Sequence, residues 1–192
     1  MDNKASGVDG GQIGIPPICT LKSAHAQLHK SSRRHTEAGG ETPDEAARAS
    51  VTLQPADERE MDRIERLLAA NDLPHGDLGA TPASFYHATD GGALVGIDGI
   101  ERRGSHGLLR SVVVPEPRRG RGYGTRLVAA LEERARTEGK TLYLLTTTAS
   151  VFFRRCGCEE TARERVPPEI RRTAEFTEHC PASATCLRKR LR

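Results

Sequence analysis

A turn rich in glycine and arginine is the feature of this sequence with the clearest chemical meaning. It follows a short β-branched run and precedes an amphipathic segment; the stretch reads Val112-Val113-Val114-Pro115-Glu116-Pro117-Arg118-Arg119-Gly120-Arg121-Gly122-Tyr123-Gly124-Thr125. A strand, a glycine turn and a helix in this order direct free backbone N–H groups, the positive end of the helix dipole and several guanidinium groups at one place. Such a place is suited to a phosphate group. The sequence therefore predicts a phosphorylated cofactor at this turn.

An ordinary strand-to-helix loop is the alternative interpretation, because glycine also serves simply to supply a positive φ. Residues 118–124 hold three glycines and three arginines, however. This is more than such a loop requires, and it favours the phosphate site.

The elements around the turn must position it within a sheet. A strand is expected at residues 108–114, and apolar positions at helical spacing, with Leu127 and Leu131 among them, define one buried face of the helix after the turn. The apolar residues 142–145 then predict a strand in the middle of a sheet.

The other expected elements extend this sheet in both directions. Asp57 and Glu60 have the spacing of a capping box at the start of a helix. The remaining expectations are a strand at 51–53, a hairpin of 85–88 and 93–97, a short helix at 151–153, a strand at 161–166, a helical turn at 168–176 and a last strand at 184–187. The order predicts an α/β fold with a mixed, mostly antiparallel sheet flanked by helices.

Composition divides the chain and limits its partners. Residues 1–48 are rich in Gly, Ser, Ala and charge without a sustained period, so a disordered tail is expected there and a folded domain at 49–192. The formal net charge of +3 makes no case for nucleic acid or a membrane as a partner. No apolar run approaches the about 20 residues of a membrane span, and we expect a cytoplasmic protein.

The element order, together with Arg119-x-x-Gly122-x-Gly124 at a strand-to-helix turn, resembles the GCN5-related N-acetyltransferase (GNAT) family. The three valines before the turn and the segment Ala149-Ser150-Val151-Phe152-Phe153-x-x-x-Gly157 add to the likeness, which covers roughly residues 50–190. The resemblance implies a GNAT fold and acetyl-CoA as cosubstrate. It also implies a small-molecule amine as acceptor, and it admits a homodimer, because many relatives dimerise.

The resemblance also implies roles for the residues of the turn. Backbone amides would cradle the pyrophosphate of acetyl-CoA at Arg119, Gly120, Arg121, Gly122, Tyr123, Gly124 and Thr125. The main chain would pair with the pantetheine arm at Val112, Val113 and Val114, where one amide would polarise the thioester carbonyl. A neutral amine would then attack the thioester directly.

Three positions depart from the family pattern. Phe153 stands where members often place a tyrosine as general acid for the leaving thiolate, and Phe153 has no proton to give. Thr146 replaces a common asparagine, and Cys158 replaces an aromatic residue. We therefore assign no catalytic acid or base.

Finer details are similar to a branch of the family found with arsenic-resistance functions, whose members can acetylate arsenic- or phosphorus-containing amino acids. The matching segments lie at residues 73–74, 108–111, 145–149, 173–176 and 180–184. A substrate oxyanion would suit an arginine fork and hydroxyl donors. The candidates are Arg110, Thr146, Thr147 and Thr148. Their plain alternatives are a solvated strand-edge arginine and threonines typical of a strand end.

The remaining candidates give weaker signals. The cysteines lack the C-x-x-C spacing of structural zinc sites, so no metal site is predicted. Glu101 is interpreted as a surface acid at a strand end rather than as a base acting through water. The competing function is a non-catalytic protein that keeps the fold and binds coenzyme A, or arsenic through its cysteines. Phe153 is the main argument for that alternative.

Overall fold

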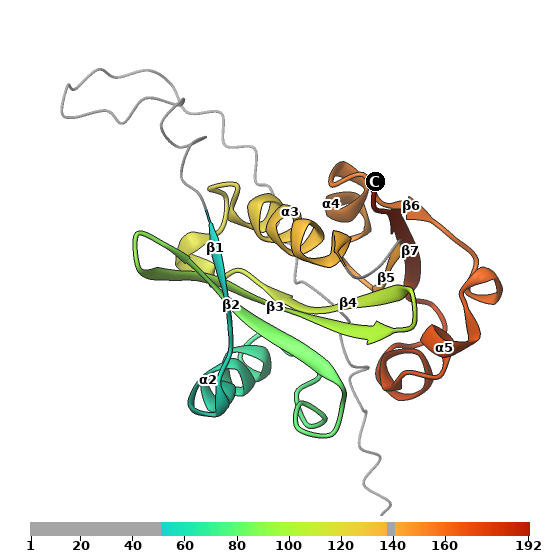
Figure 1. Cartoon of the computed structure of the whole chain (residues 1–192), viewed down its shortest axis with the longest axis horizontal. Coiled ribbons are helices and arrows are strands. Elements are labelled where there is room, and N and C mark those ends of the chain that lie inside the picture. Colours follow the sequence, from blue (N-terminus) through green and yellow to red (C-terminus); the bar gives the residue numbers. More distant parts are fainter. Residues whose placement is uncertain (1–50, 138–140) are drawn as a thin grey trace, which may run out of the picture.

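The computed structural model describes residues 51–137 and 141–192 (Figure 1). The tail expected at residues 1–48 lies outside these residues. The described part forms a seven-stranded sheet with helices on both faces, which confirms the α/β class predicted from the order of elements.

The sheet is mixed, with a single parallel pair among its described strands. Neighbouring strands are antiparallel except β4 and β5, which run parallel. In spatial order the strands are β1 (Thr52–Pro55), β2 (Ala83–Asp90), β3 (Ala93–Arg103), β4 (His106–Val113), β5 (Thr141–Thr146), β7 (Thr185–Arg190) and β6 (Glu159–Glu160).

Helices cover the two faces of the sheet unequally. The longer α3 (Tyr123–Arg136) and the short α4 (Ser150–Arg155) pack on one face, and α2 (Glu58–Ala69) and α5 (Pro168–Arg171) pack on the other (Figure 1). Three short segments, η1 (Glu116–Arg118), η2 (Arg163–Arg165) and η3 (Glu175–His179), complete the fold. Within the described residues, no helix has the length and apolar character needed to cross a membrane.

Two helix predictions are confirmed in detail. The Asp57 carboxylate accepts hydrogen bonds from the backbone of Arg59 and Glu60, and the Glu60 carboxylate accepts one from the Asp57 N–H, which completes the capping box. In α3 the expected face, including Leu127 and Leu131, is buried. Both patterns are local, so the sequence alone carries them.

The strand predicted at residues 161–166 is wrong. The actual strand, β6, is limited to Glu159 and Glu160, and the chain then turns through η2. The Arg163 guanidinium donates hydrogen bonds to the backbone oxygens of Pro181 and Phe176, and these bonds hold the turn in place. These long-range side-chain bonds replace a strand ladder, and an alternating sequence pattern does not reveal them.

The parallel pair β4 and β5 separates along its length. Their register runs from His106↔Thr141 to Leu108↔Tyr143 and stops there. On its other side β4 stays paired with β3, but with an irregularity between Ile97 and Gly99. Ser111 adopts a positive φ of 58° in this bulge. The C-terminal half of β4 therefore presents a main-chain edge that β5 does not cover.

A buried carboxylate lies under α3 without a hydrogen-bond partner. Asp98 of β3 is 1% exposed, and neither of its carboxylate oxygens has a partner in the described part of the chain. It is paired in register with Tyr86, and the Arg134 guanidinium lies 4.7 Å from the centroid of the Tyr86 ring. Burial raises the pKa of Asp98 well above its ordinary value, and the charge of Arg134 opposes this only in part.

Asp98→Asn is expected to raise the free energy of unfolding at pH 7 by on the order of 1 kcal/mol, because it removes a buried group that resists ionisation. A raised pKa in the folded state stabilises the fold at low pH and loses that contribution as pH rises above the ordinary value of 3.8 towards the folded pKa. The gain in unfolding free energy of Asp98→Asn over the wild type should therefore shrink as the pH falls towards 4. Urea unfolding across this range measures it, with the exposed Asp62→Asn as control, and a pH-independent difference would contradict the assignment.

Candidate functional site

The turn before α3 contains two glycines in the left-handed region. Gly120 has a φ of 77° and Gly122, the N-cap of α3, has a φ of 76°. A Cβ on Gly120 would meet nothing within 4 Å, so conformation rather than space requires glycine there. No side chain caps α3, and the N–H groups of its first turn therefore face outward without an intrahelical partner. This geometry can bind an anion.

Gly124 has a different role from the other two glycines. A Cβ at this position would lie 3.2 Å from the ring of Phe152 on α4. The glycine thus allows the start of α3 to approach α4 closely, as a packing requirement rather than as part of the anion-binding curve.

Two arginines at the turn, Arg119 and Arg126, donate hydrogen bonds to nearby protein oxygens, whereas Arg121 is exposed to solvent. Arg119 donates from Nε to the Val114 oxygen at 2.9 Å and from Nη2 to Oδ1 of Asn71 at 2.6 Å. Arg126 binds the Arg121 oxygen at 2.7 Å and covers the Tyr123 ring. The guanidinium of Arg119 therefore joins the turn to the segment after α2. Its backbone N–H donates to the Glu116 oxygen at 3.1 Å, so the amide expected at Arg119 for the pyrophosphate is already engaged.

Tyr123 connects the start of α3 to the β2–β3 hairpin. Its hydroxyl donates to Oδ2 of Asp90 at 2.8 Å. This hydrogen bond, with burial, raises the pKa of Tyr123. Its side chain is thus engaged with the hairpin, and its backbone remains part of the turn.

The three valines predicted to bind the pantetheine arm lie at the end of β4. Val112, Val113 and Val114 are all buried, and their side chains belong to the cores on the two faces of the sheet. Their main chain follows the point at which β4 and β5 separate. The arrangement leaves one backbone edge beside the glycine turn open to an extended ligand.

The threonines at the end of β5 have two different environments. Thr146 is fully buried, and its Oγ1 accepts a hydrogen bond from the Ala149 N–H at 3.0 Å just before α4. Thr147 and Thr148 are exposed. Thr146 thus organises the turn into α4, while the next two residues present polar groups to solvent.

Arg110 is buried in a cluster of carboxylates, which rules out the solvated strand edge. Its side chain is 0% exposed, and Nη1 and Nη2 donate to the two oxygens of Asp77 at 2.9 and 2.8 Å. Glu175 lies 3.3 Å and Glu101 3.6 Å from the same guanidinium. His179 extends the cluster, with Nε2 3.3 Å from Asp77.

Protonation in this cluster follows from burial and pairing. Burial raises the pKa of Asp77, but the hydrogen bonds and charge of Arg110 outweigh it and hold this pKa below the usual value. Burial likewise raises the pKa of Glu175, and the charges of Arg110 and His179 offset only part of that rise. The result is a buried cation facing carboxylates of unequal acidity.

Glu101 was expected on the surface, and this expectation is wrong. It is 1% exposed, and its Oε1 accepts from Nε of Arg103 at 2.9 Å. Its Oε2 has no hydrogen-bond partner within the described residues. The position at a strand end suggested solvent, but the side chains of Arg103 and of Arg110 on the neighbouring strand lie against it.

Sequence reasoning also missed Asp77, Asn71, Glu175 and His179. They reach the site from the segment after α2 and from η3, and Asp77 lies 33 residues from Arg110 along the chain. No local pattern marks such partners. Among the described residues, no group of three or more His, Cys, Asp or Glu side chains could hold a metal ion.

Phe153 lies deep in the core. It is 0% exposed, and its ring packs edge-on against Phe152 at a centroid distance of 5.0 Å. Its place in the fold is structural, so the position often held by a tyrosine supplies no acid here.

Replacing Arg110 tests the buried cluster. Arg110→Leu should lower the free energy of unfolding at pH 7 by about 3–5 kcal/mol, because it leaves buried carboxylates without their cation. The low folded pKa of Asp77 means that its pairing stabilises the protein above the unfolded pKa and that this contribution is lost as pH falls. The difference in unfolding free energy between the wild type and Arg110→Leu should therefore narrow as the pH falls below 3.8, the ordinary pKa of an aspartate.

Denaturant unfolding of the wild type and the variant at several pH values measures this, with Arg136→Leu on the exposed side of α3 as the matched control. An Arg110→Leu deficit that stays constant with pH would contradict the ion-pair account and indicate a packing loss alone.

Comparisons with known proteins agree with this geometry. The model of the Acetyltransferase (GNAT) family matches residues 47–158. No curated protein matches the chain. The solved structures described next share its fold at less than 25% identity. N-acetylglutamate synthase from Neisseria gonorrhoeae, solved with coenzyme A and N-acetyl-glutamate, has a TM-score of 0.63 and 19% identity, covering 74% of this chain and 35% of that chain.

Two further structures match over most of their own length. A Mycobacterium tuberculosis protein solved with coenzyme A has a TM-score of 0.60 and 20% identity, covering 73% of this chain and 99% of that one. An aminoglycoside 6′-N-acetyltransferase solved with coenzyme A has a TM-score of 0.55 and 18% identity, covering 73% and 97%. With the family model matching more than half of its residues, the chain belongs to the GNAT family of acetyltransferases.

Proposed function

We propose that the protein transfers the acetyl group of acetyl-CoA to the amino group of a small molecule. Membership of the family makes it an acyltransferase with acetyl-CoA as cosubstrate. The observation that carries the proposal is the meeting of two features: the turn of Gly120 and Gly122 before α3, and the open main-chain edge of β4. The first suits a pyrophosphate and the second an extended pantetheine arm.

The cofactor would be held mainly by backbone. Amides of residues 120–125 would bind the pyrophosphate, with the N-terminus of α3 behind them, because the Arg119 amide already donates to Glu116. Amides and carbonyls of residues 112–114 would pair with the pantetheine arm. The bond of Arg119 to Asn71 supports this role indirectly, because it fixes the loop before a ligand arrives.

The chemistry would depend on positioning. A neutral amine would attack the thioester carbonyl, a backbone amide at the end of β4 would stabilise the oxyanion, and the leaving thiolate would take a proton from a group that we do not assign. Phe153 cannot be that group. The protein would contribute chiefly proximity and orientation.

For the acceptor, we propose an amino acid that bears an arsenic or phosphorus oxyanion. The support is the resemblance to the arsenic-resistance branch, together with the exposed hydroxyls of Thr147 and Thr148 at the end of β5. Arg110 could reach an oxyanion only by exchanging a carboxylate partner for it, and the buried Thr146 would act through the turn. An ammonium group would instead be attracted by Glu101 and the carboxylates beside it.

The competing function, binding of arsenic through thiols without transfer, fits the cysteines poorly. Burial raises the pKa of Cys158 to about 12 and that of Cys186 to about 11, and it also raises the pKa of Cys156. The thiolate is the form that binds soft ions, and these side chains remain thiols at neutral pH.

An acceptor panel tests the substrate class. Thiol release from acetyl-CoA should be fastest with amino acids that carry an arsenic or phosphorus oxyanion, and slower with matched amines that lack it. Turnover of ordinary amines alone would reject the proposed acceptor and keep the transferase. Absence of acetyl-CoA binding in calorimetry would reject both.

A substitution in the glycine turn tests the cofactor site. Gly122→Val should weaken acetyl-CoA binding by at least about 100-fold, because a β-branched residue resists the positive φ that shapes the turn. Gly104→Val is the matched control, since Gly104 has a φ of 58° in the β3–β4 turn and should show similar backbone strain without loss of affinity. Calorimetry and a melting curve for each variant separate binding from stability, and equal affinities would remove the assignment.

A further inference from the structure

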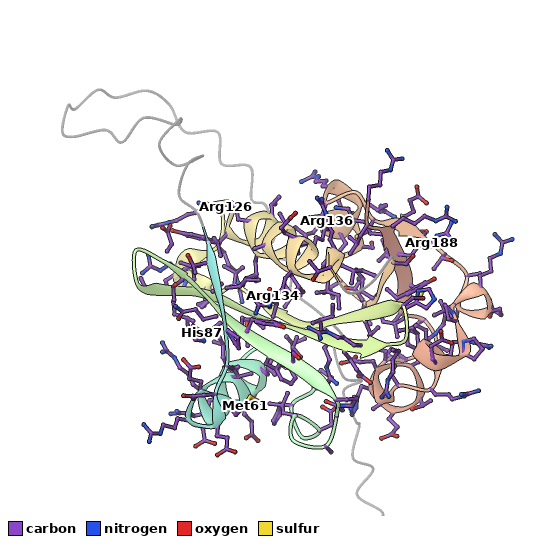
Figure 2. The ribbon with its side chains drawn as sticks, in the orientation of Figure 1. Met61, His87, Arg126, Arg134, Arg136 and Arg188 are labelled. Atoms are coloured by element: carbon purple, nitrogen blue, oxygen red, sulfur yellow. The ribbon has the colours of Figure 1, made fainter. Side chains whose placement is uncertain are left out.

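A hollow opens at the end of the sheet where β4 and β5 begin. Its volume is about 1080 Å³, and its lining includes His106 of β4, Tyr143 of β5, and Arg188 and Arg190 of β7. Figure 2 shows Arg188 at the far end of the sheet from Arg126, which marks the start of α3. The hollow is therefore separate from the glycine turn.

Strand register aligns these side chains on one face. Thr141 of β5 is opposite His106 of β4 on one side and Arg190 of β7 on the other. Two residues further along β5, Tyr143 is opposite Arg188 of β7. Residues at positions i and i+2 of a strand share a face and lie roughly 6–7 Å apart. Two guanidinium groups, a phenol and an imidazole thus line the same side of the sheet.

Two nitrogen atoms in this group are buried without partners. Nε of Arg188 and Nδ1 of His106 are inaccessible to solvent and make no hydrogen bond within the described part of the chain. Buried polar atoms are nearly always satisfied in folded proteins, by protein groups, by ordered water or by a bound ion. The His106 ring is held edge-on to Tyr143 at a centroid distance of 5.7 Å, so its orientation is fixed by packing.

The charges around the hollow are unbalanced towards positive. Glu159 is the acid in its lining and lies 3.9 Å from Arg188, and Glu169 lies 3.8 Å from His106 at the edge. No ion pair to Arg190 occurs among the described residues. Burial raises the pKa of Tyr143, so its phenol stays protonated and can donate.

We propose that this hollow binds the phosphate group of a small phosphorylated molecule other than the acetyl-CoA at the glycine turn. Arg188 and Arg190 would supply the charged hydrogen-bond donors, and Tyr143 and His106 would supply two further donors. Two arginine forks with two further donors match the three or four oxygens of a phosphate better than the two of a carboxylate. The concave shape and its size suit a small molecule rather than a nucleic acid strand.

This site does not depend on the proposed transferase function, and the test keeps the two apart. Inorganic pyrophosphate is titrated at constant ionic strength into the ¹⁵N-labelled full chain in the presence of excess coenzyme A, which occupies the glycine turn if that assignment is correct. The amide resonances of His106, Tyr143 and Arg188 should shift and saturate. The double variant Arg188→Gln and Arg190→Gln should weaken this binding by at least about tenfold, because charged hydrogen bonds are lost.

Arg59→Gln with Arg136→Gln is the matched control, since it removes the same charge from exposed positions on α2 and α3 and should leave the affinity unchanged. Arg188→Lys with Arg190→Lys keeps the charge and should bind with intermediate affinity, which excludes a folding defect as the cause. Shifts confined to residues 119–125, or equal affinities for the two double glutamine variants, would overturn the proposal.

Discussion

The early separation of β4 from β5 is the constraint on which the rest of the site depends. The two strands pair only as far as Leu108 and Tyr143, and the bulge at Ser111 then turns β4 while β3 continues to hold its other edge. The extra residue shifts the alternation of side chains. Leu109, Val112 and Val114 belong to the core under α3, although strict alternation from Leu109 would place Val112 on the opposite face. One irregular residue thus opens a backbone edge and keeps both cores filled.

Polar contacts hold the surrounding segments against this edge. Arg110, which directly precedes the bulge residue Ser111 in β4, binds Asp77 from the segment after α2. It also lies against Glu175 of η3. Arg119 joins the glycine turn to Asn71 at the end of α2. Buried charge is costly unless it is paired, so these contacts specify where the loops lie more than they add stability. The cluster also holds Glu101, whose Oε2 lies 3.6 Å from Nη1 of Arg110 and has no hydrogen-bond partner among the described residues.

The sequence revealed those parts of the fold and site that local patterns encode. The capping box of Asp57 and Glu60 and the buried stripe of α3 both follow from neighbours within one or two turns of chain. The partners of Arg110 come from distant segments, so its burial could not be seen, and Glu101 was placed on the surface for the same reason. The residues 161–166 alternate like a strand, yet the bonds of Arg163 hold them in a turn.

The two ends of β4 differ in a way that links the glycine turn to the opposite hollow. At its C-terminal end the strand is open, which a ligand that pairs with backbone requires. At its N-terminal end β4 is paired with β5, in a register that places His106 opposite Thr141 and Thr141 opposite Arg190. The last pair, Leu108 with Tyr143, sets the point at which the strands separate. Tyr143 packs in the α5-side core and against His106, so the position of the opening depends on packing at the closed end. A strand pair that is hydrogen-bonded at one end and open at the other would hold its exposed edge in place for the proposed cofactor, which would reduce the ordering cost of binding.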